Sequence, residues 1–260
     1  MKLRVLSDIH IDNWKGVKTP EEIISADKYP ADAILMAGDF GNSIDEIQSA
    51  LSAASDAYPQ CFFCLGNHDL CVHWDAKTIG TTERKIDAVR TFSSSHTNLH
   101  MLDGTVEPLG SFRIGGCTGW WNPDFDDPLV EFRWKHEWFD GANMNYGNLR
   151  SATVKEQGKL RAVLAQHPDI MMTHFAPVTI NTNPEYKWSA ANKYFYFYPG
   201  NYDWSGVKYW ICGHTHDAHV SRYKDTVILC NPYGYYSGFD GTEHPYSLNN
   251  LSQNDFIIEV

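Results

Sequence analysis

The chain has 260 residues, of which 43% are hydrophobic and 20% are charged. This composition is that of an ordinary globular protein and excludes a disordered, collagen-like or coiled-coil chain. With 21 basic against 32 acidic residues, the net charge is −11 with neutral histidines, which makes long nucleic acids and anionic membranes poor partners.

Short apolar runs alternate with helical patterns along the first half of the chain. The runs predict strands at residues 3–7, 33–37, 61–65, 99–102, 112–114, 169–172, 208–212, 226–230 and 256–260. Helical spacing of apolar residues predicts helices at 43–57, 81–91 and 151–166. Continuous apolar strands between helices indicate a sheet buried on both faces, and the successive strands near the end indicate antiparallel additions. Because no linker, repeat or low-complexity tract interrupts the chain, we expect one domain over residues 1–260.

The N-terminal residues lack the apolar stretch of a signal peptide, and no run of 18 apolar residues is present to cross a membrane. Most of the six cysteines lie inside apolar runs, which favours buried free thiols in a reducing compartment. Cys61 and Cys64 have the spacing of a redox or zinc pair, but no second pair accompanies them, so core packing is the simpler interpretation. We therefore expect a cytoplasmic protein.

Five predicted strands end in polar residues of the kinds that bind metals. The blocks are Asp8-Ile9-His10, Gly38-Asp39, Gly66-Asn67-His68-Asp69, Thr173-His174 and Gly213-His214-Thr215-His216. Ligands of open α/β sheets lie outside the carboxyl ends of strands, so these blocks have a physical reason to meet. Because residues i and i+2 of an extended chain face the same side, Asp8 with His10, and His214 with His216, can each offer two ligands to one cluster.

Seven side chains of these blocks are candidate metal ligands, which is too many for one ion. They are Asp8, His10, Asp39, Asn67, His174, His214 and His216. If one carboxylate bridges, each of two divalent ions receives about four protein ligands. The mixture of imidazole nitrogen with carboxylate and amide oxygen suits Mn, Fe, Zn, Ni or Co better than Mg or Ca, which prefer oxygen throughout. Two such ions would attract an anionic phosphate without an arginine.

The order and content of the five blocks resemble the signature of the calcineurin-like metallophosphoesterases. The Asn-Pro-x-Gly-Tyr block at residues 231–235 is similar to one found in bacterial and phage-type members. The resemblance implies an α/β fold, a four-layer α/β/β/α sandwich of two mixed β-sheets flanked by helices. It implies that one metal ion is held by Asp8, His10, Asp39 and His216. It implies that the second ion is held by Asp39, Asn67, His174 and His214, with Asp39 as the bridge.

The resemblance also implies the catalytic residues. His68 would contact the substrate beside Asn67 and protonate the leaving oxygen, and Asp69 would orient His68 by a hydrogen bond. One block departs from the family pattern, which often runs Gly-Asp-x-x-Asp and in protein phosphatases continues with arginine. Here residues 38–42 are Gly-Asp-Phe-Gly-Asn. The missing arginine, and Asp69 where the protein phosphatases have glutamate, argue against a phosphoserine phosphatase, and Asn42 is a weaker candidate partner near the site.

The implied activity is hydrolysis of a phosphoric ester at a binuclear metal centre, with a metal-bridging hydroxide attacking phosphorus and His68 as general acid. We expect a phosphodiesterase that acts on a small ester such as a nucleotide. A phosphomonoesterase or pyrophosphohydrolase with the same metal centre is an alternative, and a catalytically silent binding protein on the same fold is a second one.

Two segments, residues 119–148 and 181–204, are rich in aromatic side chains and have no clear period. One interpretation is a satellite core beneath long loops, or an interface through which the protein forms oligomers. The other is a lid whose rings stack on a base or sugar of the substrate. The sequence leaves these alternatives open.

Overall fold

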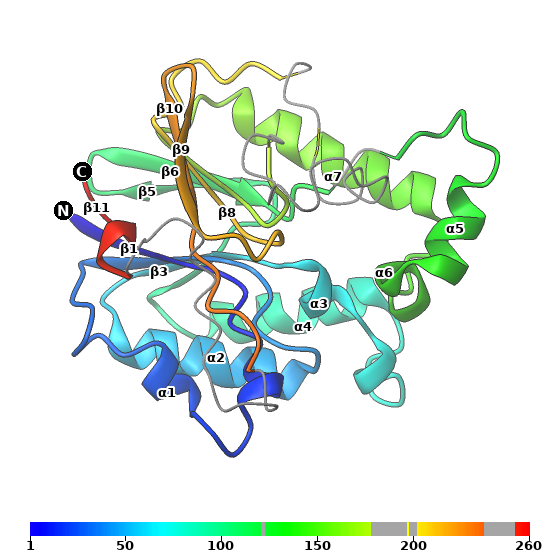
Figure 1. Ribbon diagram of the computed structural model, residues 1–260, viewed down its shortest axis with the longest axis horizontal. Helices are drawn as coiled ribbons and strands as arrows, with labels where there is room; N and C mark the ends of the chain where they lie inside the picture. The colour runs from blue at the N-terminus through cyan, green and yellow to red at the C-terminus, as the bar shows by residue number, and fades with distance from the viewer. Residues whose placement is uncertain (121–122, 178–196, 198–201, 237–252) are drawn as a thin grey trace.

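The computed structural model describes residues 1–120, 123–177, 197, 202–236 and 253–260. Its strands form two mixed β-sheets that lie one above the other (Figure 1). The five-stranded sheet has the order β11 (Ile257–Glu259), β1 (Lys2–Leu6), β2 (Ala33–Ala37), β3 (Cys61–Cys64) and β4 (Leu99–Met101). The six-stranded sheet has the order β5 (Thr105–Leu109), β6 (Phe112–Cys117), β7 (Ile170–Thr173), β8 (Tyr209–Cys212), β10 (Thr226–Cys230) and β9 (His219–Tyr223).

Helices flank both sheets, as the sequence predicts. The outer side of the five-stranded sheet carries α1 (Pro20–Ile23), α2 (Ile44–Ala57) and α4 (Thr82–Ser94), and the six-stranded sheet carries α7 (Leu149–Leu164) (Figure 1). The shorter helices are α3 (Asn67–Leu70), α5 (Val130–Glu137) and α6 (Phe139–Asn143), with 3-10 turns at Ile11–Trp14, His73–Asp75 and Gln253–Phe256. None of the helices in the described ranges is long and apolar enough to cross a membrane.

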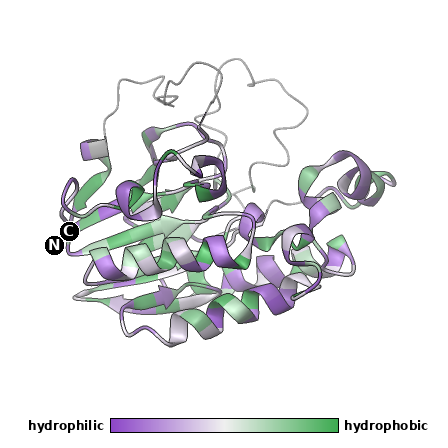
Figure 2. Ribbon diagram, turned by 90° about the horizontal axis from the view of Figure 1, so that it is seen from below, coloured by the Kyte–Doolittle hydropathy of each residue, from purple (hydrophilic) through white to green (hydrophobic). Residues whose placement is uncertain are grey.

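The strands are apolar throughout because both of their faces are covered. All five residues of β2 are buried, and the strands are mostly green in the hydropathy view (Figure 2). Leu35 and Phe62 from one sheet meet Ile114 and Met172 from the other in the core between the sheets. Neighbouring residues on the opposite strand faces pack against the helices instead. This double burial explains why continuous apolar runs, and not alternating ones, marked the strands.

Local signals placed the first long helix correctly. The Ser43 side chain accepts a hydrogen bond from the Glu46 amide, and the Glu46 carboxylate accepts one from the Ser43 amide, so a capping box is present at the start of the helix. The third predicted helix begins earlier than expected, because the Asn148 side chain caps it by accepting from the Ser151 amide. The strands β5 and β9 were not predicted; both are edge strands, and β5 contains Pro108, which only an edge tolerates well.

The arrangement of parallel strands brings the five polar blocks to one place. In the first sheet β1, β2 and β3 are parallel neighbours, and in the second β7 and β8 are. The strands β2 and β8, and likewise β3 and β7, contact each other across the two sheets. The blocks follow these strands directly, so they meet at the carboxyl ends of both sheets.

Candidate metal centre

Backbone hydrogen bonds tie the loops after the strands to one another. The amide of Asp8 donates to the carbonyl of Gly38 at 3.0 Å, and the amide of His10 donates to the carbonyl of Asp39 at 3.0 Å. The amide of His214 donates to Oδ1 of Asp8 at 2.9 Å. Segments that lie about 200 positions apart in the chain are therefore fixed at hydrogen-bond distance.

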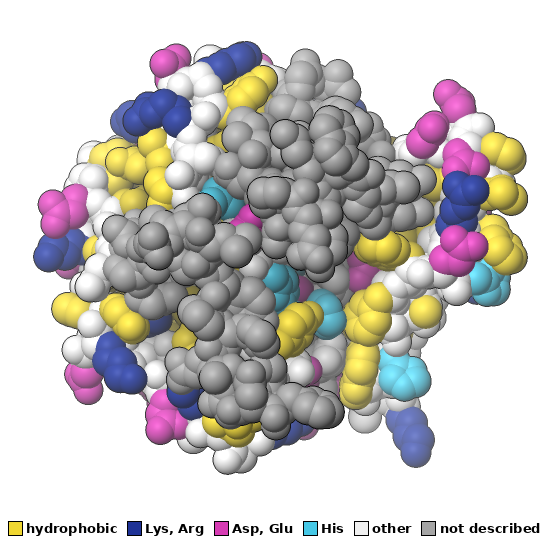
Figure 3. Space-filling model, in the orientation of Figure 1, with side chains coloured by type: hydrophobic (Ala, Val, Ile, Leu, Met, Phe, Trp, Pro, Cys, Tyr) yellow, Lys and Arg dark blue, Asp and Glu magenta, His cyan; other side chains and the backbone are white. Residues whose placement is uncertain are grey.

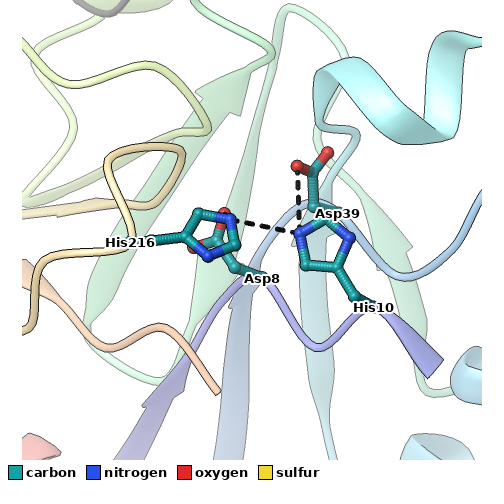
Figure 4. A group of neighbouring side chains, drawn as sticks. All are labelled: Asp8, His10, Asp39 and His216. Carbon is teal, nitrogen blue, oxygen red and sulfur yellow. Dashed lines mark hydrogen bonds and ion pairs between the residues drawn. The ribbon is translucent and has the colours of Figure 1, made fainter. Parts of the chain in front are cut away.

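The first group of candidate ligands consists of Asp8, His10, Asp39 and His216, whose donor atoms all lie within 4.8 Å of one another (Figure 4). Nε2 of His10 lies 3.2 Å from Nε2 of His216 and 3.6 Å from Oδ2 of Asp39. Nε2 of His216 lies 3.5 Å from Oδ1 of Asp8. Donor atoms that face one another at these distances have the arrangement of metal ligands.

The second group consists of Asp39, His174 and His214, and Asn67 joins it. Oδ1 of Asn67 lies 2.8 Å from Nε2 of His174 and 2.9 Å from Nδ1 of His214. Oδ2 of Asp39 lies 3.3 Å from Nε2 of His174. Asp39 thus belongs to both groups, and all seven candidates from the sequence lie together in two groups that share one carboxylate.

Burial and charge fit these groups for binding cations. Burial lowers the pKa of His10 well below its usual value, although the charge of Asp39 opposes it. Burial acts to raise the pKa of Asp39, but the charges of His174 and His68 outweigh it and hold that pKa well below its usual value. Burial also acts to lower the pKa of His174, but Asp39 outweighs it and raises that pKa to about 10. An ion that binds both Asp39 and His174 must therefore displace a proton from His174.

A buried carboxylate oxygen of the first group points to a bound cation. Oδ2 of Asp8 is buried and has no hydrogen bond among the residues that the structure describes. An unsatisfied buried acceptor costs about 1–3 kcal/mol, and a metal ion beside it removes that cost. The donor set, two carboxylates and an amide oxygen with imidazoles, is one that transition ions accept. The residues present therefore fit the metal pair that the sequence implies.

The backbone at the site is strained. Five candidate ligands have positive φ angles, namely Asp8 (49°), His10 (40°), Asp39 (59°), His214 (68°) and His216 (52°). Among the described residues other than glycine, only two more have positive φ. Each such residue costs about 1–3 kcal/mol, a cost that is concentrated at functional sites in proteins.

Gly66 lets the second and third loops approach closely. A Cβ at this position would collide with Oδ1 of Asp39 and would lie 2.6 Å from the Asp39 backbone nitrogen. The same Oδ1 accepts a hydrogen bond from the His68 amide at 2.9 Å. Glycine at 66 is therefore a requirement for the position of the shared carboxylate.

The expected hydrogen bond from Asp69 to His68 is wrong. Asp69 is fully buried, and its two oxygens accept from backbone amides of residues 39, 40, 41 and 66 instead. Burial, and then the charge of Asp39, raise the pKa of the Asp69 carboxyl to about 7, although the amide donors lower it. Asp69 occupies the third position of α3, where a carboxylate reaches back to the helix start, so it fastens two loops together.

Asn42 takes the place beside His68 that we assigned to Asp69. Oδ1 of Asn42 lies 2.9 Å from Nδ1 of His68. The other end of the Asn42 amide, Nδ2, donates to Oδ2 of Asp12 at 2.8 Å. Because Asp12 accepts from the amide nitrogen, the amide oxygen is turned toward His68 and accepts a hydrogen bond from its ring.

Comparisons with known proteins agree with this geometry. A model of the calcineurin-like phosphoesterase family matches residues 1–218. The chain belongs to this family. It is therefore a metal-dependent phosphoesterase with an Asp/His cluster that can bind metals. No curated protein matches its sequence significantly.

Two solved structures of other proteins are similar to this phosphoesterase. The phosphopantetheinyl hydrolase from Mycobacterium tuberculosis is 17% identical, with a TM-score of 0.71, and the match covers 90% of this chain and 89% of that one. An archaeal phosphodiesterase is 12% identical, with a TM-score of 0.39 and coverage of 92% and 87%. The first likeness supports the fold of two mixed sheets flanked by helices.

A cavity of about 520 Å³ opens beside the candidate ligands of the phosphoesterase, and three of the lining side chains outside the predicted site set stand out. The ring of Phe139 stacks on His68 at 4.7 Å, and the ring of Tyr235 stacks on His216 at 4.7 Å. The third is Asp140, next to Phe139 on α6. In Figure 3, histidine side chains gather near the middle of the face, with hydrophobic ones beside them. Tyr235 belongs to the Asn-Pro-x-Gly-Tyr block and Phe139 to the aromatic segment 119–148, whereas Asp140 had no sequence signal.

The aromatic segments have more than one role. In the first, Trp120 packs against Trp134, Tyr146 and Phe175 in the core, which is the satellite core we considered, while Phe139 lines the cavity. Much of the second segment, residues 181–196 and 198–201, lies outside the described residues. A lid or an oligomer interface stays a prediction.

Proposed function

We propose that this phosphoesterase hydrolyses small phosphodiesters at a binuclear centre of divalent transition ions. The single observation that carries the proposal is the position of Asp39. Its Oδ2 lies 3.6 Å from Nε2 of His10 in one group and 3.3 Å from Nε2 of His174 in the other. A carboxylate between two such groups is what a pair of ions that share one ligand requires.

Each ion would have four protein ligands. Asp8, His10, Asp39 and His216 would hold one. Asp39, Asn67, His174 and His214 would hold the other. When bound, the two ions would supply Lewis acidity toward the phosphoryl oxygens and an activated water as nucleophile.

His68 is the proposed general acid. It lines the cavity, and Asn42 occupies its Nδ1, so Nε2 is the nitrogen left to protonate a leaving oxygen. A group that protonates the leaving oxygen contributes about 10²–10⁴-fold to the rate, and an alkyl leaving group needs it most. His68→Ala should therefore slow alkyl-leaving diesters far more than nitrophenyl esters. Equal losses on both would remove His68 from this role.

The charge of the cavity favours a diester over a monoester. The described side chains that line it include no lysine or arginine, so little besides the ions would neutralise a second negative charge on the substrate. A diester carries one such charge and a monoester about two near neutral pH. The packing of Phe139 on His68 also places an apolar ring beside the position of the leaving group, as a nucleotide base or sugar would need.

The test is a comparison of metals and substrates. The protein is loaded separately with Mn, Fe, Zn, Ni and Co, and rates are measured on bis(p-nitrophenyl) phosphate, p-nitrophenyl phosphate, a cyclic nucleotide, a pyrophosphate and a phosphopantetheinyl ester. We expect the diesters to be preferred. A monoester or pyrophosphate preference of about tenfold or more, which is about 1.4 kcal/mol of barrier, would overturn this preference. Full metal occupancy without turnover of any ester would favour a silent binding protein instead.

A single domain over residues 1–260 and a cytoplasmic location also stay predictions. Limited proteolysis would test the first of these, because a second domain would leave a stable fragment that ends at an exposed linker.

A further inference from the structure

We propose that Asp140 positions Asn67 as a ligand of the second metal ion, and that helix α6 is thereby part of the metal centre. The inference rests on the binuclear centre proposed above. It adds a residue that lies outside the five blocks and about 70 positions away from the asparagine that it contacts.

The Asn67 amide has two chemically different ends, and each faces a different partner. Its Oδ1 points at Nε2 of His174 and Nδ1 of His214, at 2.8 and 2.9 Å. Its Nδ2 donates to Oδ1 of Asp140 at 2.8 Å. An amide oxygen has lone pairs for a metal ion and an amide nitrogen has none to offer. Only one of the two flipped orientations of Asn67 can therefore bind the ion.

Asp140 selects that orientation. An ionised carboxylate is only an acceptor, so it accepts a hydrogen bond from Nδ2 and repels Oδ1. Asn67 is 5% exposed and Asp140 is 1% exposed, so water does not readily replace either partner. Without the carboxylate, a buried Nδ2 donor would lack a partner, and Asn67 would gain by turning its nitrogen toward the imidazoles. The oxygen would then face away from the ion.

The helix that carries Asp140 is held firmly against the site. A Cβ on Gly141 would collide with the carbonyl oxygen of Trp134, so α6 packs tightly on the end of α5. The amide of Val72, just after α3, donates to the carbonyl of Asn143 at 2.8 Å. Asp140 near the start of α6 and Asn143 at its end are thus both hydrogen-bonded to the segment that begins with Asn67. This contact lies at the side of the molecule where α5 and α6 are seen (Figure 1).

The experiment measures metal binding and not only activity. Mn²⁺ is titrated calorimetrically into the metal-free protein, with occupancy checked by elemental analysis, for wild type, Asp140→Ala and Asp140→Asn. The wild type should bind two ions. Asp140→Ala should weaken one site by about 10–100-fold, the usual effect of removing a residue that orients a ligand. Asp140→Asn keeps an oxygen that can accept from Asn67 and should restore most of the affinity. Glu137→Ala, which removes an exposed carboxylate at the nearby end of α5, should bind both ions as wild type does.

A second set of variants identifies which of the two metal sites Asp140→Ala weakens. With His10→Ala, only the second group remains intact, and adding Asp140→Ala should weaken the remaining site. With His174→Ala, the same addition should have no effect. If Asp140→Ala does not fold without metal, Asp140→Ser, which is too short to reach Asn67, replaces it.

Three outcomes would overturn the inference. They are unchanged affinity in Asp140→Ala, equal weakening of both sites, and a failure of Asp140→Asn to restore binding. A wild-type protein that binds fewer than two ions would instead contradict the proposed function, so the two failures are distinguishable.

Discussion

The sharpest prediction concerns Asp69, whose carboxylate we expect to hold the site together and not to act on His68. Oδ2 accepts from the amides of Asp39 and Gly66, both at 2.8 Å, and Oδ1 accepts from the amides of Phe40 and Gly41, at 2.8 and 3.3 Å. The change Asp69→Asn keeps the shape of the side chain but replaces one oxygen with an NH₂ group. That group would face two amide donors, so two hydrogen bonds to a charged acceptor are lost.

The magnitude follows from these two bonds. A hydrogen bond to a charged group contributes about 1.5–3 kcal/mol, so the free energy of unfolding should fall by at most about 3–6 kcal/mol. The fall is smaller than this bound because the neutral amide escapes the cost of burial and the repulsion from Asp39 that the carboxylate bears. Because burial and the charge of Asp39 raise the pKa of Asp69 to about 7, the measurement belongs at pH 8, where the carboxylate is ionised. Urea unfolding of the metal-free protein gives the value. The matched control is Asp126→Asn, an exposed residue, which should change the free energy by less than about 0.5 kcal/mol.

The result that would refute this reasoning is also specific. If Asp69→Asn unfolds within about 1 kcal/mol of wild type and loses activity only on alkyl-leaving esters, Asp69 orients His68 after all. The hydrogen bonds by which Asp69 joins the two loops would then contribute little to the free energy of unfolding.

Three other changes test separate parts of the site. Asn42→Ala removes the hydrogen-bond acceptor at Nδ1 of His68. Steady-state rates on alkyl-leaving diesters should fall at least about tenfold, which is part of the 10²–10⁴-fold due to general acid catalysis. Equal losses on nitrophenyl esters would show that Asn42 does not support His68 as the acid. Gly66→Ala should displace Asp39 and abolish binding of both Mn²⁺ ions in a calorimetric titration, while Gly158→Ala, which meets nothing within 4 Å, should bind them normally; intact binding in Gly66→Ala would show that the loops can yield. Mn²⁺ at 100 times its dissociation constant should raise the free energy of unfolding by about 2.7 kcal/mol per site in urea titrations, and a chelator should reverse the gain; an unchanged midpoint would argue against metal binding to the folded state.

Much of the fold could be predicted from the sequence because strands that are buried on both faces appear as continuous apolar runs. Short continuous apolar runs such as residues 33–37, followed by glycine, are typical of a strand in a sheet covered on both faces. The convergence of polar residues followed as well, since parallel strands deliver their carboxyl ends to one edge. The seven candidate ligands could therefore be placed in one cluster from the sequence, whereas their division between two ions came from the family resemblance.

The contacts around the site were harder to predict because they depend on side-chain direction and on distant packing. Asp69 was misjudged because its role was taken from the family resemblance and not from the local backbone. As the third residue of a short helix, its carboxylate turns back toward Gly66 and away from His68. Asp140 left no local trace at all, because its partner Asn67 is reached only through the packing of α6. Phe139 was hidden among aromatic neighbours with no helical period.

The most direct test of the account is a crystal of the Mn²⁺-loaded protein, with data collected at the manganese absorption edge. The account predicts two anomalous peaks about 3.5–4 Å apart, with Asp39 in contact with both, Asp8 near one and His174 near the other. A single peak in excess metal, or two peaks of which only one touches Asp39, would contradict it.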